Sequence, residues 1–287
     1  MSDQLSGAYA GFAGVYERFM QEAEVPYAAW AAFVQELIAR YGVSQPLQAG
    51  TAPADALQQE RALVVERGCG TGAFTRALSA LGYDLCGIDV SAEMLAEAQR
   101  RQAAEGGSIL YLEQDMRELD LYCTAGTFVS VYDSMNYLLT ETDLLQTLRL
   151  VNNFLYPGGI FIFDFNTLYK YRDVMGDTTF AVHLADGSTM LWENAFYMEG
   201  ETEETPETCV NEATLTFFVR EAAADTGIPL YRRFSEVHDQ RGWTLDEVTR
   251  LVTEAGLEVV TALDADTHDA PTDTSERIYM VARKIMK

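Results

Sequence analysis

From residue 61 onward, short apolar runs alternate with stretches whose apolar positions recur every three or four residues. The short runs are typical of buried strands, and the longer stretches are typical of amphipathic helices. The predicted strands are 62–66, 84–89, 108–113, 127–132 and 160–164, and the helices between them are 73–81, 92–104 and 141–155. Strands separated by helices of this length predict a parallel sheet with helices on both faces.

This alternation stops at residue 165. Residues 190–198 and 213–219 instead alternate with period two, which predicts an antiparallel insertion of about three or four strands. Thr244, followed three residues later by Glu247, forms a predicted capping box where the helical pattern returns. The elements predicted after it are a helix over 245–255 and strands over 257–263 and 277–283.

The N-terminal region has a pattern of its own. Apolar residues at helical spacing, among them Phe12, Val15 and Phe19, predict helical structure over residues 9–41 with a break at Pro26. The next stretch is rich in Pro, Gly and small polar residues and is predicted to be a linker. The expected organisation is an N-terminal helical segment with its linker (1–59), one α/β domain (60–166 and 236–287) and an antiparallel β insertion (167–235).

Composition narrows the class of protein. Hydrophobic residues make up 48% of the 287 positions, which is enough for a large core and excludes global disorder. The formal net charge of −24 repels phosphates, so we expect no general affinity for nucleic acid. The four cysteines lack CxxC spacing, which predicts neither a disulfide framework nor a metal site. No secretory signal or membrane-spanning apolar run is recognisable, so we expect a cytoplasmic protein without a membrane span.

The strongest chemical signal is a glycine-rich turn between a strand and a helix. Gly68, Gly70 and Gly72 would let the backbone pass close to a ligand. Taken alone, the turn is also compatible with incidental glycines or with a dinucleotide fold, because Ala73 completes a suitable spacing. Glu66 favours another ligand, because its charge would lie where a pyrophosphate has to lie and suits an ammonium and a sulfonium instead.

Two further acidic positions follow the next strands. Asp89 ends the second strand, where a carboxylate can accept hydrogen bonds from both ribose hydroxyls of an adenosine. Asp115 follows the third strand, where it can accept the adenine amino group while Met116 packs on the ring. Four such elements at successive strand ends indicate an adenosine-containing ligand more strongly than any one of them.

With these motifs the sequence resembles the class I S-adenosylmethionine-dependent methyltransferases, over almost the whole chain. The matching runs are 66–72, 87–95, 114–116 and 155–159, and those at 132–138, 163–167 and 236–238 resemble a small-molecule-type subgroup with an insertion after strand five. The resemblance implies a Rossmann-like seven-stranded sheet of order 3-2-1-4-5-7-6 with strand seven antiparallel, and an N-terminal helical lid. Two positions depart from the family: Glu66 stands where Asp is usual, and Arg67 replaces a usually apolar residue.

The resemblance also implies site residues, with S-adenosylmethionine as cofactor and S-adenosylhomocysteine as product. The implied cofactor-binding residues are Tyr16, Glu66, Gly68, Cys69, Gly70, Gly72, Asp89, Val90, Met94, Asp115, Met116 and Asp133. The candidate acceptor-binding residues are Asn136, Tyr137, Asp164, Asn166 and His238. Asp133 lies either beside the methyl group or at the cap of the next turn, and His238 is either a proton acceptor or a structural histidine.

We therefore expect methyl transfer to a small molecule by direct displacement at the methyl carbon. No Lys or Arg lies between Arg117 and Arg149, whereas Asp133 and Asp164 flank the expected methyl position. The resulting negative potential favours an amine acceptor first and a hydroxyl second. Two alternatives stay open here, an NAD-dependent oxidoreductase and a non-catalytic cofactor-binding module. The oligomeric state is open between monomer and homodimer.

Overall fold

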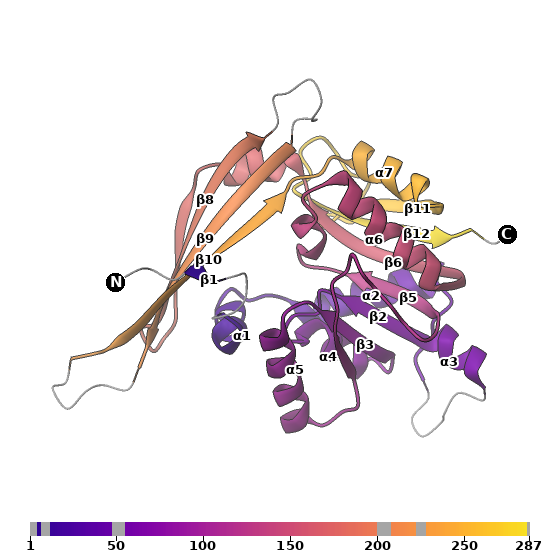
Figure 1. The fold of residues 1–287 in the computed structure, drawn as a ribbon, viewed down its shortest axis with the longest axis horizontal. Coiled ribbons are helices and arrows are strands. Elements are labelled where there is room, and N and C mark those ends of the chain that lie inside the picture. Colours follow the sequence, from indigo (N-terminus) through magenta and orange to yellow (C-terminus); the bar gives the residue numbers. More distant parts are fainter. Residues whose placement is uncertain (1–4, 7–11, 48–54, 200–207, 222–227, 286–287) are drawn as a thin grey trace.

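The computed structural model describes residues 5–6, 12–47, 55–199, 208–221 and 228–285. Their strands form two sheets, one of seven strands and one of five (Figure 1). The larger sheet has the order β11-β12-β6-β5-β2-β3-β4. Its parallel strands are β2 (Leu63–Arg67), β3 (Asp84–Asp89), β4 (Leu110–Glu113), β5 (Ala125–Ser130) and β6 (Leu155–Asn166). The antiparallel pair is β12 (Arg277–Lys284), next to β6, and β11 (Leu257–Asp264) at the edge.

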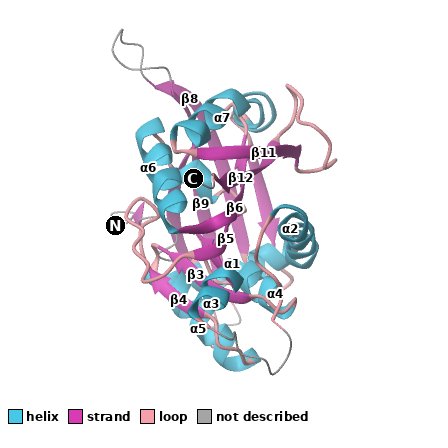
Figure 2. Cartoon of the chain, turned by 90° about the vertical axis from the view of Figure 1, so that its right-hand side faces the viewer, coloured by secondary structure: helices cyan, strands magenta, loops and turns pink. Residues whose placement is uncertain are grey.

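This strand order confirms the predicted fold class. Numbered along the chain, the strands follow the expected order 3-2-1-4-5-7-6, and strand seven is antiparallel as expected. Helices cover both faces of the sheet (Figure 2). On one face lie α2 (Tyr27–Tyr41) and α4 (Ala73–Ala80), and on the other lie α6 (Glu141–Phe154) and α7 (Leu245–Glu254). Helix α5 (Ala92–Glu105) packs beside β3 and β4.

The alternation of side chains along β6 explains this double layer. Phe161, Phe163 and Phe165 are buried in the cluster that also contains α6 and α7. Ile160 and Ile162 point to the other face and are buried with α2 and α4. Successive side chains of a strand point to opposite faces, so a continuous apolar run requires cover on both sides. The predicted capping box at the start of α7 is also present.

Several boundaries differ from those predicted. The strand expected over 127–132 ends at Ser130, because the chain turns into the left-handed region at Tyr132 and Asp133. Part of the expected linker is helix α3 (Ala56–Ala62), whose N-cap Asp55 accepts the backbone N–H of Gln58 at 2.8 Å. The sequence signals also did not predict a π-helical segment, Lys170–Met175. Residues 48–54 lie outside the described part of the chain.

The second sheet has the order β1-β10-β9-β8-β7. Its strands are β1 (Leu5–Ser6), β7 (Thr179–His183), β8 (Thr189–Glu199), β9 (Thr208–Arg220) and β10 (Tyr231–Arg241). Strands β7 to β10 pair antiparallel, as predicted for the insertion, and β1 adds a parallel edge strand from the N-terminal region. Strand β10 runs past residue 235, so the proposed division at that position falls inside a strand.

Helix α1 (Ala13–Glu22) lies between the two sheets (Figure 1). Phe12 and Phe19 pack against Phe217 of β9, with ring centroids 4.6 and 5.6 Å apart. On its other side, the buried carboxylate of Glu17 pairs with Arg76 of α4 at 3.0 Å and with Arg101 of α5 at 2.8 Å. The helix therefore joins the insertion to the helices beside the glycine turn. No helix in the described ranges is both long and apolar enough to cross a membrane.

Candidate cofactor and acceptor site

A cavity of about 260 Å³ opens beyond the carboxyl ends of β2, β3, β4 and β5. Its walls come from the glycine turn, the turns after β3 and β4, the segment after β5, and helices α1 and α2. The predicted site residues on its wall are Tyr16, Glu66, Gly68, Cys69, Gly70, Asp89, Val90, Met94, Asp115, Met116 and Tyr137. The wall does not include Gly72, Asp133, Asn136, Asp164, Asn166 or His238.

Two glycines of the turn are required by close packing. Gly68 has φ +71°, and a Cβ there would clash with the side chain of Ser134. Gly72 has φ +72°, and a Cβ there would clash with the ring and hydroxyl of Tyr111. Both positions combine a left-handed backbone with a close neighbour, which only glycine tolerates. Gly72 thus shapes the start of α4, whereas Gly70 has no neighbour within 4 Å of a Cβ position and lies on the cavity wall.

Glu66 reaches the cavity from the end of β2 and is buried. The hydroxyl of Thr75 donates a hydrogen bond to its carboxyl group. Burial raises the pKa of Glu66 to about 8, the neighbouring Asp89 adds to the increase, and the Thr75 bond opposes it. A carboxyl group with this pKa is mostly protonated at neutral pH, so the predicted negative charge requires a cation beside it.

Asp89 at the end of β3 and Asp115 after β4 both line the cavity. Asp89 accepts the backbone N–H groups of Gly70 at 2.8 Å and of Ser91 at 2.9 Å, one on each carboxylate oxygen. Burial raises the pKa of Asp89, although these N–H donors oppose the shift. Asp115 is paired with Arg117, 2.6 Å away, and this hydrogen bond is the main reason that its pKa lies below the usual value.

Arg67 holds the turn at Met116 through hydrogen bonds that the sequence did not predict. Its buried guanidinium donates to the carbonyl of Met116, and to the carbonyl of Thr147 at 3.4 Å. Burial lowers the pKa of Arg67 to about 9, and the charge of Asp115 opposes this decrease. Within the described ranges its Nε has no hydrogen-bond partner. The departure from an apolar residue noted in the sequence therefore places a poorly compensated cation under the Asp115–Met116 turn.

Tyr137 begins a chain of polar groups that leads away from the cavity. Its hydroxyl lies 2.8 Å from Nδ1 of His238, and Nε2 of His238 lies 3.5 Å from a carboxylate oxygen of Glu236. The other oxygen of Glu236 accepts the backbone N–H of Phe12 at 2.8 Å, just before α1. His238 and Glu236 are both buried and lie on the same face of β10. The structure therefore places His238 behind Tyr137, one residue removed from the cavity.

Asn136 and Asn166 hold elements together rather than facing the cavity. The amide of Asn136 donates to the carbonyl of Asn166 at 3.0 Å and to that of Arg241 at 2.7 Å, while its oxygen accepts the N–H of Asn166 at 2.9 Å. These bonds join the 3-10 turn Ser134–Tyr137 to β6 and β10. The side-chain amide of Asn166 donates to the hydroxyl of Tyr171 at 2.9 Å, and its oxygen accepts from Lys170 and Arg277.

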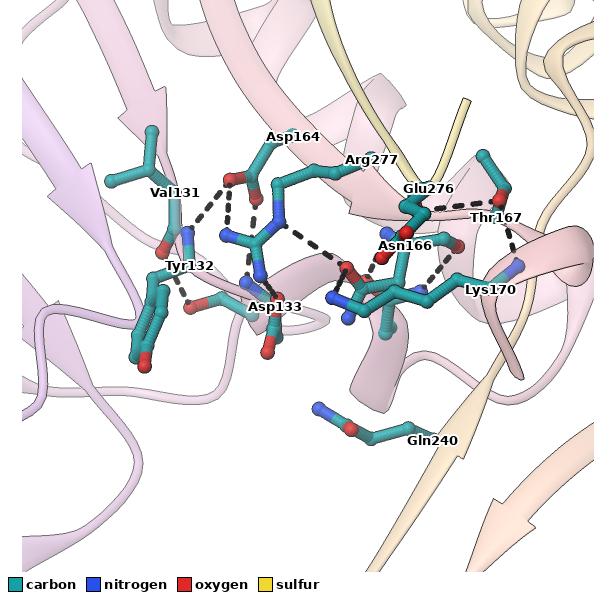
Figure 3. Close-up of polar contacts among 12 residues, drawn as sticks. Val131, Tyr132, Asp133, Asp164, Asn166, Thr167, Lys170, Gln240, Glu276 and Arg277 are labelled. Carbon is teal, nitrogen blue, oxygen red and sulfur yellow. Dashed lines mark hydrogen bonds and ion pairs between the residues drawn. The ribbon is translucent and has the colours of Figure 1, made fainter. Parts of the chain in front are cut away.

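Asp133 and Asp164 are both paired with Arg277, which partly neutralises the two carboxylates expected beside the methyl position (Figure 3). Arg277 is the first residue of β12 and lies far along the chain from the stretch between Arg117 and Arg149 that has no Lys or Arg. Asp133 occupies the cap position of the 3-10 turn, but its side chain makes no capping hydrogen bond. Asp133 thus takes the cap position by its backbone, while its side chain is engaged by Arg277.

Aromatic rings line the cavity on the side of helices α1 and α2. Tyr16 from α1, Tyr27 and Trp30 from α2, and Tyr132 after β5 all line it. The rings of Trp30 and Tyr132 have centroids 5.0 Å apart, and those of Tyr27 and Trp30 are 5.8 Å apart. Faces of such rings attract cations. The wall can therefore hold a positively charged or apolar group near the segment after β5.

The chain belongs to the class I S-adenosylmethionine-dependent methyltransferases. A family model described as a methyltransferase domain matches residues 64–159. A protein of Geobacillus sp. (strain WCH70) whose name gives it as a methyltransferase is 32% identical over 276 residues, covering 96% of this chain and 99% of its own length. The fold and the match together set aside an oxidoreductase and a non-catalytic module: the protein is an S-adenosylmethionine-dependent methyltransferase.

Solved structures extend this similarity to the whole fold. An S-adenosylmethionine-dependent methyltransferase from Clostridium acetobutylicum ATCC 824 has a TM-score of 0.76 at 25% identity, covering 97% of this chain and all of that one. The sugar N-methyltransferase KedS8 from Streptoalloteichus sp. ATCC 53650 has a TM-score of 0.69 at 18% identity, covering 99% and 98% of the two chains. At that identity the second likeness concerns the fold alone.

Proposed function

We propose that the protein methylates an amino nitrogen of a small molecule, with a hydroxyl acceptor as the second choice. The observation that carries this proposal is the chain of groups from Tyr137 on the cavity wall through His238 to Glu236. An amine is protonated at neutral pH and has to lose a proton before its nitrogen can attack. A tyrosine backed by a histidine offers such a proton a path out of the cavity.

The proposed cofactor contacts lie in the part of the cavity formed by the glycine turn and the turns after β3 and β4. Asp89 would accept the ribose hydroxyls, Asp115 would accept the adenine amino group, and Met116 would pack against the ring. Glu66 and the backbone at Gly70 would lie beside the methionine part, whose ammonium and sulfonium supply the cations that a buried carboxyl group needs in order to ionise. When bound, S-adenosylmethionine supplies an electrophilic methyl group, and its displacement leaves S-adenosylhomocysteine.

The protein's own residues would then position the acceptor and remove its proton. The aromatic wall of Tyr16, Trp30 and Tyr132 suits a cationic or apolar amine, and in-line positioning itself lowers the barrier. The protonated amine would first give a proton to the hydroxyl oxygen of Tyr137 while the hydroxyl proton of Tyr137 moves to Nδ1 of His238. The nitrogen lone pair freed in this way would then accept the methyl group, and the electrons of the carbon–sulfur bond would stay on sulfur. Glu236 stabilises the resulting imidazolium from the other side.

The test is a methyl-transfer screen over matched amines, alcohols and carboxylates that measures formation of S-adenosylhomocysteine. We expect amines to be methylated, and we expect Tyr137→Phe and His238→Gln to lower kcat by about 10²-fold or more, as for loss of a general base. His183→Gln is the matched control, because His183 is exposed and bonds to Thr189 on the outer strands. Turnover of carboxylates alone, or an unchanged kcat in His238→Gln, would refute the amine proposal.

A further inference from the structure

The segment after β5 has an unusual backbone where it joins the cavity wall. Tyr132 has φ +65° and Asp133 has φ +70°, two consecutive residues other than glycine in the left-handed region. Residues with a Cβ occupy this region only when the surrounding structure holds them there. Tyr132, Ser134 and Tyr137 all line the cavity, so this strained turn determines where the acceptor-side wall lies.

One side chain, Arg277, contacts the two left-handed residues of this turn and the end of β6 beside it (Figure 3). Its Nη2 lies 2.5 Å from a carboxylate oxygen of Asp133, and its Nη1 lies 3.2 Å from Asp164. Its Nε donates to the side-chain oxygen of Asn166 at 3.2 Å. The guanidinium carbon also lies 5.3 Å from the centre of the Tyr132 ring. A planar, always charged fork is the group that can make such contacts at once.

Asp164 links Arg277 to the backbone of the turn. Its buried carboxylate accepts the N–H of Tyr132 at 3.1 Å and the N–H of Asp133 at 3.3 Å, the two amides of the left-handed residues. Burial raises the pKa of Asp164, and the positive charge of Arg277 opposes this rise. Burial itself lowers the pKa of Arg277, but Asp133 and Asp164 outweigh that effect and leave the pKa above its usual value. The guanidinium therefore stays charged throughout the working pH range.

We infer that Arg277 is a positioning residue for the acceptor-side wall, acting through Asp133, Asp164 and the ring of Tyr132. It holds the turn after β5 in its left-handed form and so sets the places of Ser134 and Tyr137 beside the glycine turn. The carboxylate of Asp133 is then engaged by Arg277 and not directed into the cavity. The inference rests on the proposed use of this cavity for the cofactor, and it needs no knowledge of the acceptor.

The test is calorimetric titration of the full chain with S-adenosylhomocysteine. We expect Arg277→Ala to raise the dissociation constant at least tenfold, and Arg277→Lys to raise it less, because an ammonium can pair with one carboxylate but cannot span both. Guanidinium at low millimolar concentration, well below denaturing levels, is expected to restore binding to Arg277→Ala and to leave the wild type unchanged. Arg283→Ala is the matched control, because Arg283 lies on the same strand and its nearest carboxylate, of Glu258, is 3.9 Å away.

Asp133→Asn provides a second route, because it removes the ion pair while leaving Arg277 and the buried Asp164 in place. We expect it to raise the dissociation constant several-fold with little change in melting temperature, even where Arg277→Ala folds poorly. Unchanged binding in both variants, or a loss in Arg277→Ala that guanidinium does not reverse, would overturn the inference. A wild-type protein that does not bind S-adenosylhomocysteine would contradict the proposed function of the cavity instead.

Discussion

Binding of S-adenosylmethionine is expected to release a proton from Glu66. The pKa of this buried carboxyl group is raised to about 8 in the free protein, so it is about 90% protonated at pH 7. A ligand that brings an ammonium and a sulfonium close to it favours the ionised form. If the bound complex holds Glu66 ionised, about 0.9 proton leaves for each molecule bound at pH 7.

The same linkage sets the pH dependence of affinity. The ionised fraction of a group with pKa 8 is about 1% at pH 6 and about 24% at pH 7.5, so the association constant should rise roughly twentyfold over this interval. The ligand's own amino group remains largely protonated over that range. Glu66→Gln keeps the shape of the side chain and removes the titration, and its affinity should be independent of pH.

Calorimetry in buffers of different ionisation enthalpy measures the released proton directly. A plot of apparent binding enthalpy against buffer enthalpy should have a slope close to one proton for the wild type at pH 7 and a slope near zero for Glu66→Gln. A wild-type slope near zero together with flat affinity between pH 6 and 7.5 would refute the reasoning. It would mean that the carboxyl group keeps its proton when the ligand binds.

The same raised pKa has a consequence for stability in the absence of ligand. A carboxyl group whose pKa is higher in the folded state than in the unfolded state binds its proton more tightly when folded. Folded stability therefore falls as pH rises from about 4.5 to about 8, by on the order of 4 kcal/mol relative to Glu66→Gln. Denaturant unfolding of both proteins at several pH values would show this divergence, and parallel curves would contradict it.

Three further predictions concern the cofactor half and the lid. Asp89→Ala should weaken S-adenosylmethionine binding by about 1.5–3 kcal/mol, the scale of hydrogen bonds to a charged group, and calorimetry of the folded variant checks this. Glu17→Gln should speed release of S-adenosylhomocysteine by roughly tenfold in stopped-flow experiments, because Arg76 and Arg101 lose the buried carboxylate that ties α1 to α4 and α5. Arg18→Ala is the control, because Arg18 lies on the same helix in a half-exposed ion pair, and it should change the release rate little. Arg67→Leu should leave the melting temperature unchanged or raise it, because a buried and poorly compensated cation is removed, and should weaken adenosine binding, because the carbonyl of Met116 loses its donor. A lower melting temperature with unchanged adenosine binding would assign Arg67 to stability alone.

The parts of the fold that the sequence predicted are those built from local signals. Strand β3 was predicted with its observed limits, because an apolar run ends there at Asp89 and a capping serine follows. Strand β6 is longer than predicted, because it includes a segment with Pro157 and two glycines that local propensity assigns to a turn. Helix α3 fell in a stretch judged to be a linker, because its one clear signal was the cap Asp55.

The candidate site divides in the same way. The part of the cavity proposed to hold the cofactor is lined mainly by positions 66 to 116, most of them at or just after the ends of β2, β3 and β4, so that spacing along the chain reports neighbours in space. Arg67 was noticed only as a departure from the family pattern. The direction of its side chain, under the turn at Met116, depends on how β2 lies beside the middle of α6, which no local signal encodes.

The acceptor half depends on pairs that are distant in sequence. Tyr137 meets His238 across 101 positions, and Asp133 meets Arg277 across 144. In each pair one partner lies after β5 and the other lies on β10 or β12, so only the folded sheets bring them together. This explains why the charges near Asp133 in the sequence did not reveal Arg277, the cation that pairs with it in the folded protein. The same difference separates the two proposed parts of the site. Substitutions on β10, such as at His238, should alter the proposed acceptor side. Asp89, in the proposed cofactor part, keeps its hydrogen bonds to the nearby backbone of Gly70 and Ser91.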